Sequence, residues 1–206
     1  MGDVSVPVTS PDSTGPRPDA PRLNALCANV ELKAKIPRLA DAVAIAQRLG
    51  AVDAGEDEQT DTYFSLGTER LKLRESSSGV HLLIRYSRPD RVAPRKSQYR
   101  LMLVKDAASF KSMLTRQWGV KAVVRKRRRT FVWEGRVRIH LDVVHGLGEF
   151  IEFTAMLDPT RPDYDESAAA LDVARLAHDF AVRHEDLVAT SYATLVLASP
   201  GIPSGT

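Results

Sequence analysis

The sequence has few of the features that would place it in a membrane, on a secretory route or around a structural metal. Cysteine occurs once, at Cys27, so the 206-residue chain can form no internal disulfide and no cysteine zinc site. No apolar run approaches the roughly 18 residues that cross a bilayer. The first residues are acidic and proline-rich, unlike a signal peptide. We therefore expect a cytoplasmic protein without membrane association.

Net charge is also small, at +3 for 29 basic and 26 acidic residues. This balance does not by itself indicate nucleic acid, so the placement of the charges matters more than their sum. The basic run "RKRRR", residues 125–129, would suit nucleic acid if all its side chains pointed outward. Strand alternation sends about half of them inward, so we do not expect a nucleic-acid partner.

Two end segments are too polar to bury enough apolar area to offset chain ordering. Residues 1–24 are rich in proline, serine, aspartate and glycine, and residues 200–206 are similar. We predict that both are disordered tails. The hydrophobic content of 43% suits a single core, which we place in one domain over residues 25–199.

Between the tails, the hydrophobic period alternates between two and 3.6 residues. Strands are predicted at residues 29–36, 59–66, 69–76, 79–89, 97–104, 121–135, 137–146 and 149–157. Helices are predicted at residues 37–50, 106–119, 165–184 and 185–198. Turns at residues 134–135 and 146–148 are typical of hairpins. The pattern therefore predicts an α+β fold, with an antiparallel sheet of about eight strands and helices outside it.

Several of these strands have one charged face. In the first, Glu31, Lys33 and Lys35 alternate with apolar residues. The same alternation places a further set of charged residues on one face of later strands: Lys72, Arg74, Lys126, Arg128, Arg138, His140, Asp142 and Glu152. A solvated outer face is the simpler interpretation of any one strand. However, the set is mostly cationic, whereas a solubilising face usually mixes signs. If the sheet closes into a barrel, the helices coat its outside and the charges line its interior.

Converging cations need a partner, because two like charges about 4 Å apart repel by about 4 kcal/mol at an effective dielectric near 20. A polyphosphate is the natural ligand, since arginine and lysine bind its oxygens directly. Carboxylates in the same lumen would repel it unless a hard cation lay between them. Composition and spacing therefore predict a metal-dependent triphosphate site.

Eight short motifs appear in an order that resembles the CYTH superfamily, also called triphosphate tunnel metalloenzymes. They span about residues 28–198: "ELKAK", "QTDTYF", "RLKLRE", "LIRYSRPD" followed by "RKSQY", "VVRKRR", "RIHLD", "GLGEFIEF" and "EDLVATSYATL". The family includes class IV adenylyl cyclases, thiamine triphosphatases and inorganic triphosphatases. The resemblance implies a closed eight-stranded antiparallel β-barrel, a tunnel with a charged lumen and helices packed outside.

The resemblance also implies a role for individual residues. The metal ligands would be Glu31, Asp142 and Glu152, holding Mg²⁺ or Mn²⁺. The phosphate-binding residues would be Lys33, Lys35, Lys72, Arg74, Arg88, Lys126, Arg128 and Arg138. His140 is a candidate acid or base, and no other catalytic group is assigned. The family's opening and closing strands usually carry a second glutamate, where this chain has Lys33 and Thr154. The number of metal ions, one or two, therefore stays open.

The implied activity is metal-dependent phosphoryl chemistry on a nucleoside or organic triphosphate, or on inorganic polyphosphate. Attack by water on the terminal phosphorus would make the chain a triphosphatase. Attack by a ribose 3′-hydroxyl on the α-phosphorus would make it a class IV-type adenylyl cyclase that releases cyclic AMP and pyrophosphate. A third alternative is a non-catalytic protein that binds polyphosphate or phosphorylated ligands. The organic group, and a monomeric or homodimeric state, stay open.

Overall fold

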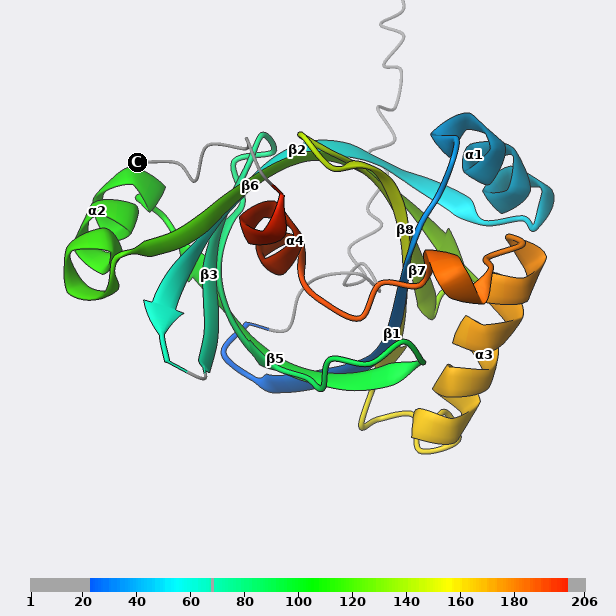
Figure 1. Cartoon of the computed structure of the whole chain (residues 1–206). Coiled ribbons are helices and arrows are strands. Elements are labelled where there is room, and N and C mark those ends of the chain that lie inside the picture. The colour runs from blue at the N-terminus through cyan, green and yellow to red at the C-terminus, as the bar shows by residue number, and fades with distance from the viewer. Residues whose placement is uncertain (1–22, 68, 200–206) are drawn as a thin grey trace, which may run out of the picture.

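The computed structural model describes residues 23–67 and 69–199, and within them eight β-strands form one closed antiparallel barrel (Figure 1). The strands follow the order β1-β5-β4-β3-β2-β6-β7-β8, and β8 pairs with β1 to close the ring. Their bounds are β1 (Leu26–Lys35), β2 (Val52–Leu66), β3 (Glu69–Ser76), β4 (His81–Ser87), β5 (Arg95–Val104), β6 (Val120–Trp133), β7 (Val137–Val144) and β8 (Gly148–Leu157). The predicted fold class is confirmed. The predicted tails, apart from residues 23 and 24, lie outside the described residues.

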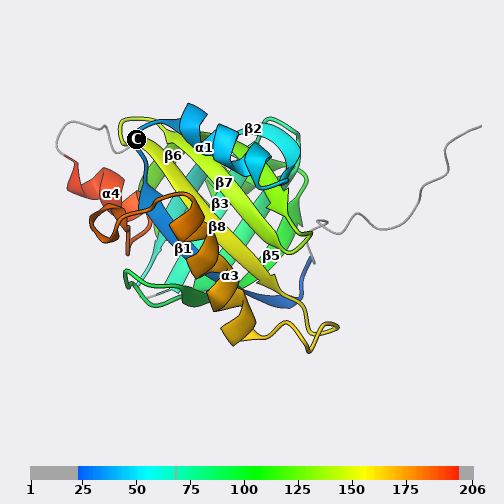
Figure 2. The same ribbon diagram turned by 90° about the vertical axis from the view of Figure 1, so that its right-hand side faces the viewer.

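Four α-helices within the described residues accompany the barrel: α1 (Leu39–Arg48), α2 (Ala107–Trp118), α3 (Glu166–Asp179) and α4 (Tyr192–Ala198). Helices α1 and α3 lie against the outside of the β7 and β8 region (Figure 2). Helix α2 covers β2 and β3 on another side. Within the described residues, no helix has the length and apolar character needed to cross a bilayer.

The outward side chains of the barrel are apolar where helices cover them. On β7, Val137, Ile139 and Leu141 are fully buried against α1 and α3. On β3, Leu71 and Leu73 pack beneath α2. Burying one such side chain contributes about 1.5–3 kcal/mol. Because strand side chains alternate between faces, this outward apolar packing turns the charged positions toward the inside of the barrel.

Helix α4 lies across one end of the ring of strands (Figure 1). It begins after Ser191, whose side chain accepts a hydrogen bond from the backbone of Thr194. Its buried side chains Tyr192 and Val196 pack against inward residues near the ends of the strands, including Phe150. The helix therefore covers part of this end of the barrel, which we call the α4 end.

The predicted helix at 185–198 is correct only in its second half. Residues 184–186 form one 3₁₀ turn, and the chain is then extended up to α4. The extension has a clear cause: the backbone N–H of Val188 donates to the Lys33 carbonyl at 2.9 Å, and Leu187 forms a bridge with Ala34. Pairing with β1 therefore replaces helix here. The preceding helix also ends earlier than predicted, at Asp179, and Ala181 has a positive φ of 52°.

Strand β2 is longer than predicted, since it starts at Val52 rather than residue 59. Its first half is polar, but it pairs with β6 across a register shift after Asp53. The ion pair between Asp53 and Arg129, at 2.5 Å, supports that pairing. The predicted turn between β6 and β7 is confirmed, with positive φ at Glu134 and Gly135 as a tight hairpin requires.

Candidate functional site

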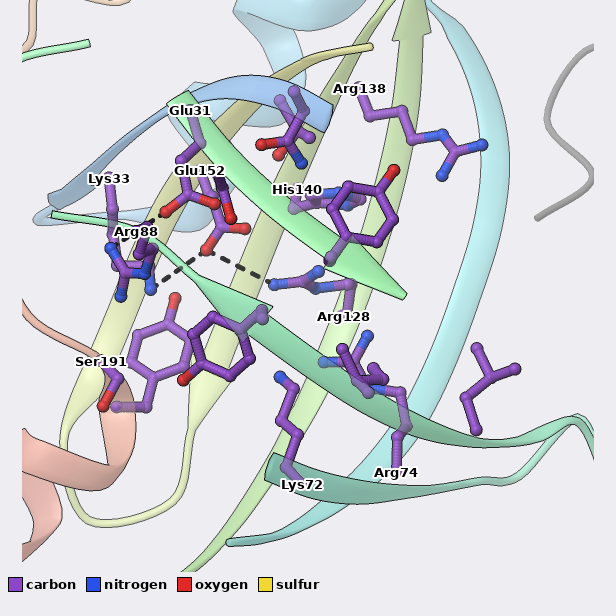
Figure 3. Close-up of a pocket in the computed structure, with 18 of the residues that line it drawn as sticks. Glu31, Lys33, Lys72, Arg74, Arg88, Arg128, Arg138, His140, Glu152 and Ser191 are labelled. Carbon is purple, nitrogen blue, oxygen red and sulfur yellow. Dashed lines mark ion pairs between the residues drawn. The ribbon is translucent and has the colours of Figure 1, made fainter. Parts of the chain in front are cut away.

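A cavity of about 300 Å³ lies inside the barrel and is lined by inward side chains from all eight strands of the described chain (Figure 3). Ten of the twelve residues predicted from the sequence line it: Glu31, Lys33, Lys72, Arg74, Arg88, Lys126, Arg128, Arg138, His140 and Glu152. Ser191 and Tyr192 reach it from the α4 end. The predicted charged face therefore converges inside a closed barrel. The roles predicted for its members stay predictions.

The first charged cluster centres on Asp61, which sequence reasoning missed. Its carboxylate is fully buried and accepts hydrogen bonds from Lys72 Nζ at 2.7 Å and from Arg74 Nε and Nη2 at 2.7 and 2.8 Å. Burial alone would raise the pKa of Asp61, but Arg74 and Lys72 hold this pKa well below its usual value. Burial and the neighbouring Arg74 lower the pKa of Lys72 to about 8. Asp61 thus fixes two of the predicted phosphate-binding cations.

The second cluster centres on Asp142, a predicted metal ligand. Arg128 donates to both of its oxygens at 2.6 Å, and the Tyr192 hydroxyl donates to Oδ2 at 2.8 Å. Lys126 lies 3.6 Å from the same oxygen. Burial would raise the pKa of Asp142, but the charges of Arg128 and Lys126 lower it overall. Asp142 is fully buried behind Arg128 and outside the lining of the cavity, and its contacts are those of a counter-ion.

The third cluster joins Glu31 to two arginines. Arg88 Nη1 lies 3.0 Å and Arg95 Nε 3.2 Å from Glu31 Oε1. Arg95 is almost wholly buried and also donates to the backbone carbonyl of Arg91 at 2.6 Å. Burial and the charge of Arg88 lower the pKa of Arg95. Arg95 was not predicted, because it follows a proline-containing loop where no alternation marks its direction.

The fourth cluster lies where β1, β8 and β7 meet. Register places Lys33 and His140 on either side of Glu152, and Lys33 Nζ is 3.1 Å from its Oε2. Burial would raise the pKa of Glu152, but Lys33 and Arg128 hold it well below its usual value. Burial and Arg128 lower the pKa of His140, so its imidazole is neutral near pH 7. The Lys33 ammonium also lies 4.0 Å from the centre of the Tyr192 ring, a cation–π contact.

Lys35 is the remaining predicted phosphate-binding residue. It pairs with Phe150 in register at the last position of β1. The structure places it exposed and outside the cavity lining. Its predicted contact with phosphate stays a prediction.

The clusters together give the site a positive charge. In the described part of the chain, eight cationic side chains line or directly back the cavity, Arg95 included, against the four carboxylates of Glu31, Asp61, Asp142 and Glu152. When all are ionised, the excess is four positive charges. Each cluster is internally paired, but the tunnel as a whole has a charge that an anionic ligand would neutralise.

Mg²⁺ and Mn²⁺ are the metal ions that the sequence predicts for this site. Across residues 23–67 and 69–199, no three acidic, histidine or cysteine side chains gather closely enough to hold a metal by themselves. Two carboxylates, Glu31 and Glu152, do line the cavity. Mg²⁺ is usually held by one or two carboxylates together with substrate phosphates and water. The residues therefore fit one ion shared with a bound phosphate chain, with Glu31 and Glu152 as its protein ligands.

Comparisons with known proteins agree with this geometry. The CYTH domain family matches residues 28–185. The structure of PH1012 from Pyrococcus horikoshii OT3 is 21% identical, with 81% of this chain and 98% of that chain covered and a TM-score of 0.72. A proposed adenylate cyclase from Vibrio parahaemolyticus is 25% identical, with coverages of 83% and 98% and a TM-score of 0.64. The Hippeastrum protein HpAC1, a proposed adenylyl cyclase described as having a dominant triphosphatase activity, is 12% identical, with coverages of 87% and 100% and a TM-score of 0.56. No curated protein matches.

Proposed function

The chain belongs to the CYTH family, and from this premise we propose that it hydrolyses a triphosphate held in the cationic tunnel. CYTH proteins bind triphosphate substrates and are generally metal-dependent. The names of the Vibrio and Hippeastrum proteins support triphosphate chemistry of this kind, including both cyclisation and hydrolysis.

The observation that carries the proposal is the gathering of eight cationic side chains against four carboxylates around one cavity inside the barrel. Inner phosphoryl groups carry one negative charge each, and a terminal phosphate carries nearly two above its second pKa of about 6. An organic triphosphate therefore brings roughly four negative charges. This match of sign distinguishes the tunnel from a site for a neutral metabolite.

The chain's own residues would act mainly by positioning and electrostatic stabilisation. Arg74 and Arg128 present planar guanidinium groups whose geometry suits phosphoryl oxygens. Asp61 and Asp142 hold these groups before any ligand arrives, so little reorganisation is needed as charge develops in the transition state. His140, neutral near pH 7, is the candidate to accept a proton from attacking water. A divalent ion, when bound, would neutralise charge on the phosphates and polarise the reacting phosphoryl group.

Cyclisation is the second candidate, favoured by the 25% identity to a proposed adenylate cyclase. The same tunnel would then position a ribose 3′-hydroxyl rather than water against the α-phosphorus. Non-catalytic binding is the third candidate. It is favoured because each of the four site carboxylates already has a cationic partner in place of a metal ion.

One experiment separates these functions. The full-length protein is incubated with ATP, thiamine triphosphate and tripolyphosphate, each with Mg²⁺ or Mn²⁺. Release of inorganic phosphate supports the proposal, and pyrophosphate with a cyclic nucleotide supports cyclisation. Binding without turnover supports a binding protein. No binding of any triphosphate contradicts the proposed function altogether.

Two variants connect the activity to the site. Glu152→Gln should abolish turnover while leaving affinity for tripolyphosphate within a few fold, and survival of turnover would refute its assignment to the metal. Arg128→Lys should weaken binding, because it loses the paired geometry of the guanidinium. Arg127→Lys is the matched control on the same strand: Arg127 points outward and lies 3.7 Å from Glu56, with about half of its side chain exposed. It should bind and turn over like the wild type.

A further inference from the structure

The wall of the cavity is divided into two chemically different parts. Five of its cations come from β3, β6 and β7, on one side of the barrel: Lys72, Arg74, Lys126, Arg128 and Arg138. The other side is formed by the contiguous strands β4, β5, β1 and β8. Toward the α4 end these strands also carry charge. Away from it, their cavity-lining residues are uncharged: Asn29, Leu82, Ile84, Ser97, Tyr99, Leu101, Thr154 and Met156. We call this second set the neutral subsite.

The strand register shows that the neutral subsite is a continuous surface. Asn29 on β1 lies opposite Ser97 on β5 and, on its other side, opposite Met156 on β8. Ile84 on β4 lies opposite Leu101 on β5. Lys33, which marks the α4 end, is four residues further along β1 than Asn29. At about 3.3 Å per residue, the two positions are roughly 13 Å apart along the strand.

The neutral subsite also contains polar atoms that lack partners. Within the described residues, the side-chain oxygens of Asn29 and Thr154 are buried and make no hydrogen bond. Buried polar groups are normally hydrogen-bonded, because an unmet group loses its interaction with water. Both residues line the cavity, so a bound molecule can supply the missing donors.

The apolar members add an apolar surface beside these polar atoms. Leu82, Ile84 and Leu101 line the cavity from neighbouring strands, and the Tyr99 hydroxyl lies 3.8 Å from the Met156 sulfur. A largely apolar wall with a few placed polar groups is the usual composition of a small-molecule site. A phosphate chain has no group that would use such a wall.

We infer that the neutral subsite binds the organic group of the triphosphate, a nitrogen heterocycle that carries an amino group. This inference rests on the proposed function, because the phosphate chain must lie in the cationic part for the organic group to reach Asn29. The unpaired side-chain oxygens of Asn29 and Thr154 need donors, and the exocyclic amino group of adenine or of an aminopyrimidine can supply them. Inorganic tripolyphosphate would leave the subsite empty.

The test measures binding rather than turnover. Full-length wild-type protein is titrated calorimetrically in EDTA with ATP, thiamine triphosphate and tripolyphosphate. At least one organic triphosphate should bind about tenfold more tightly than tripolyphosphate, since one or two hydrogen bonds and the apolar contact are added. The ATP and thiamine triphosphate arms then identify which heterocycle the subsite accepts.

Variants assign the difference to the subsite. Asn29→Leu and the isosteric Thr154→Val should each reduce the preference for the organic triphosphate several-fold and leave tripolyphosphate affinity within about twofold. Gln98→Leu is the matched control, because this exposed amide lies on β5 between Ser97 and Tyr99. It should change neither affinity. A urea unfolding curve for each variant establishes whether it is folded. If Asn29→Leu does not fold, Thr154→Val alone carries the test.

The outcomes separate this inference from the proposed function. If tripolyphosphate binds as tightly as both organic triphosphates, or if the variants weaken all three ligands equally, the neutral subsite is not a site for the organic group. The cationic tunnel would then still bind phosphate. If the wild type binds none of the three ligands, the proposed function fails and the inference fails with it.

Discussion

Replacing Asp61 by asparagine provides the sharpest test of how this tunnel is held together. The substitution keeps the size and shape of the side chain and removes only its charge. Lys72 and Arg74 would then lose the carboxylate that now accepts three hydrogen bonds from them, at 2.7 to 2.8 Å. Both cations are largely enclosed, with side-chain exposures of 14% and 15%, so water replaces that partner poorly.

The expected loss is large. Removing one partner of a buried ion pair costs about 3–5 kcal/mol, because the other charge stays buried without compensation. A domain of this kind has a free energy of unfolding of about 5–15 kcal/mol, so the change is a substantial fraction of the total. The Asp61 pKa is lowered by folding, so its contribution is fully present above an unfolded pKa of about 4 and is lost as pH falls toward the folded pKa. At pH 7 the full effect should be measured.

The measurement is the free energy of unfolding in urea at pH 7. Asp53→Asn is the matched control, because Asp53 lies on the same strand and pairs with Arg129 at a partly exposed site. An exposed pair contributes about 0.2–1 kcal/mol. If Asp61→Asn loses no more stability than Asp53→Asn, then Asp61 is not the counter-ion that keeps two cations in the lumen, and the electrostatic account of the barrel interior is wrong.

Three further predictions concern the cavity itself. Because the pKa of Lys72 is about 8, affinity for tripolyphosphate in EDTA should fall by up to tenfold per pH unit above pH 8. Lys72→Arg stays protonated and should flatten this dependence of affinity on pH. If the variant has the same pH dependence as the wild type, Lys72 is not a phosphate-binding residue. Lys33→Glu places a third carboxylate in the cavity beside Glu152, so the number of Mn²⁺ ions bound with tripolyphosphate, counted by electron paramagnetic resonance, should rise from one to two. A count of two in the wild type would refute the single-ion fit. Tyr192→Phe removes the hydroxyl that donates to buried Asp142 and keeps the ring, so unfolding in urea should show a loss of about 1–3 kcal/mol. A loss below about 0.5 kcal/mol would mean that Arg128 alone satisfies Asp142.

Much of the barrel could be predicted from the sequence, because the alternation of charged and apolar residues survives in nearly every strand. It assigned Lys126 and Arg128 to one face of β6 and Ile139 and Leu141 to the opposite face of β7, and the structure confirms both directions. The first half of β2 was missed, because its polar residues carry no alternation. Pairing with β6 makes it a strand, which is a long-range effect that local sequence does not record.

The partners of each charge were harder to predict than its direction. Asp142 has the same alternation as Arg138 and His140, so the sequence groups it with the cavity-lining residues. Register places it opposite Arg128, which covers it and takes both of its oxygens. Asp61 lies between two threonines and lacks a charged neighbour that would mark its face. Its signal was the alternation with Tyr63, which also lies on the inward side of β2.

The burial of the four carboxylates separates two kinds of role within one charged tunnel. Asp61 and Asp142 have no exposed surface and each holds two cations, so they make the cation cluster stable in the absence of a ligand. Glu31 and Glu152 keep 12–15% of their side-chain surface open and line the cavity, so these are the two of the four that we propose as ligands of a bound ion. Neutralising a member of the first pair should therefore lower stability first, whereas neutralising a member of the second should impair turnover in a protein that stays folded.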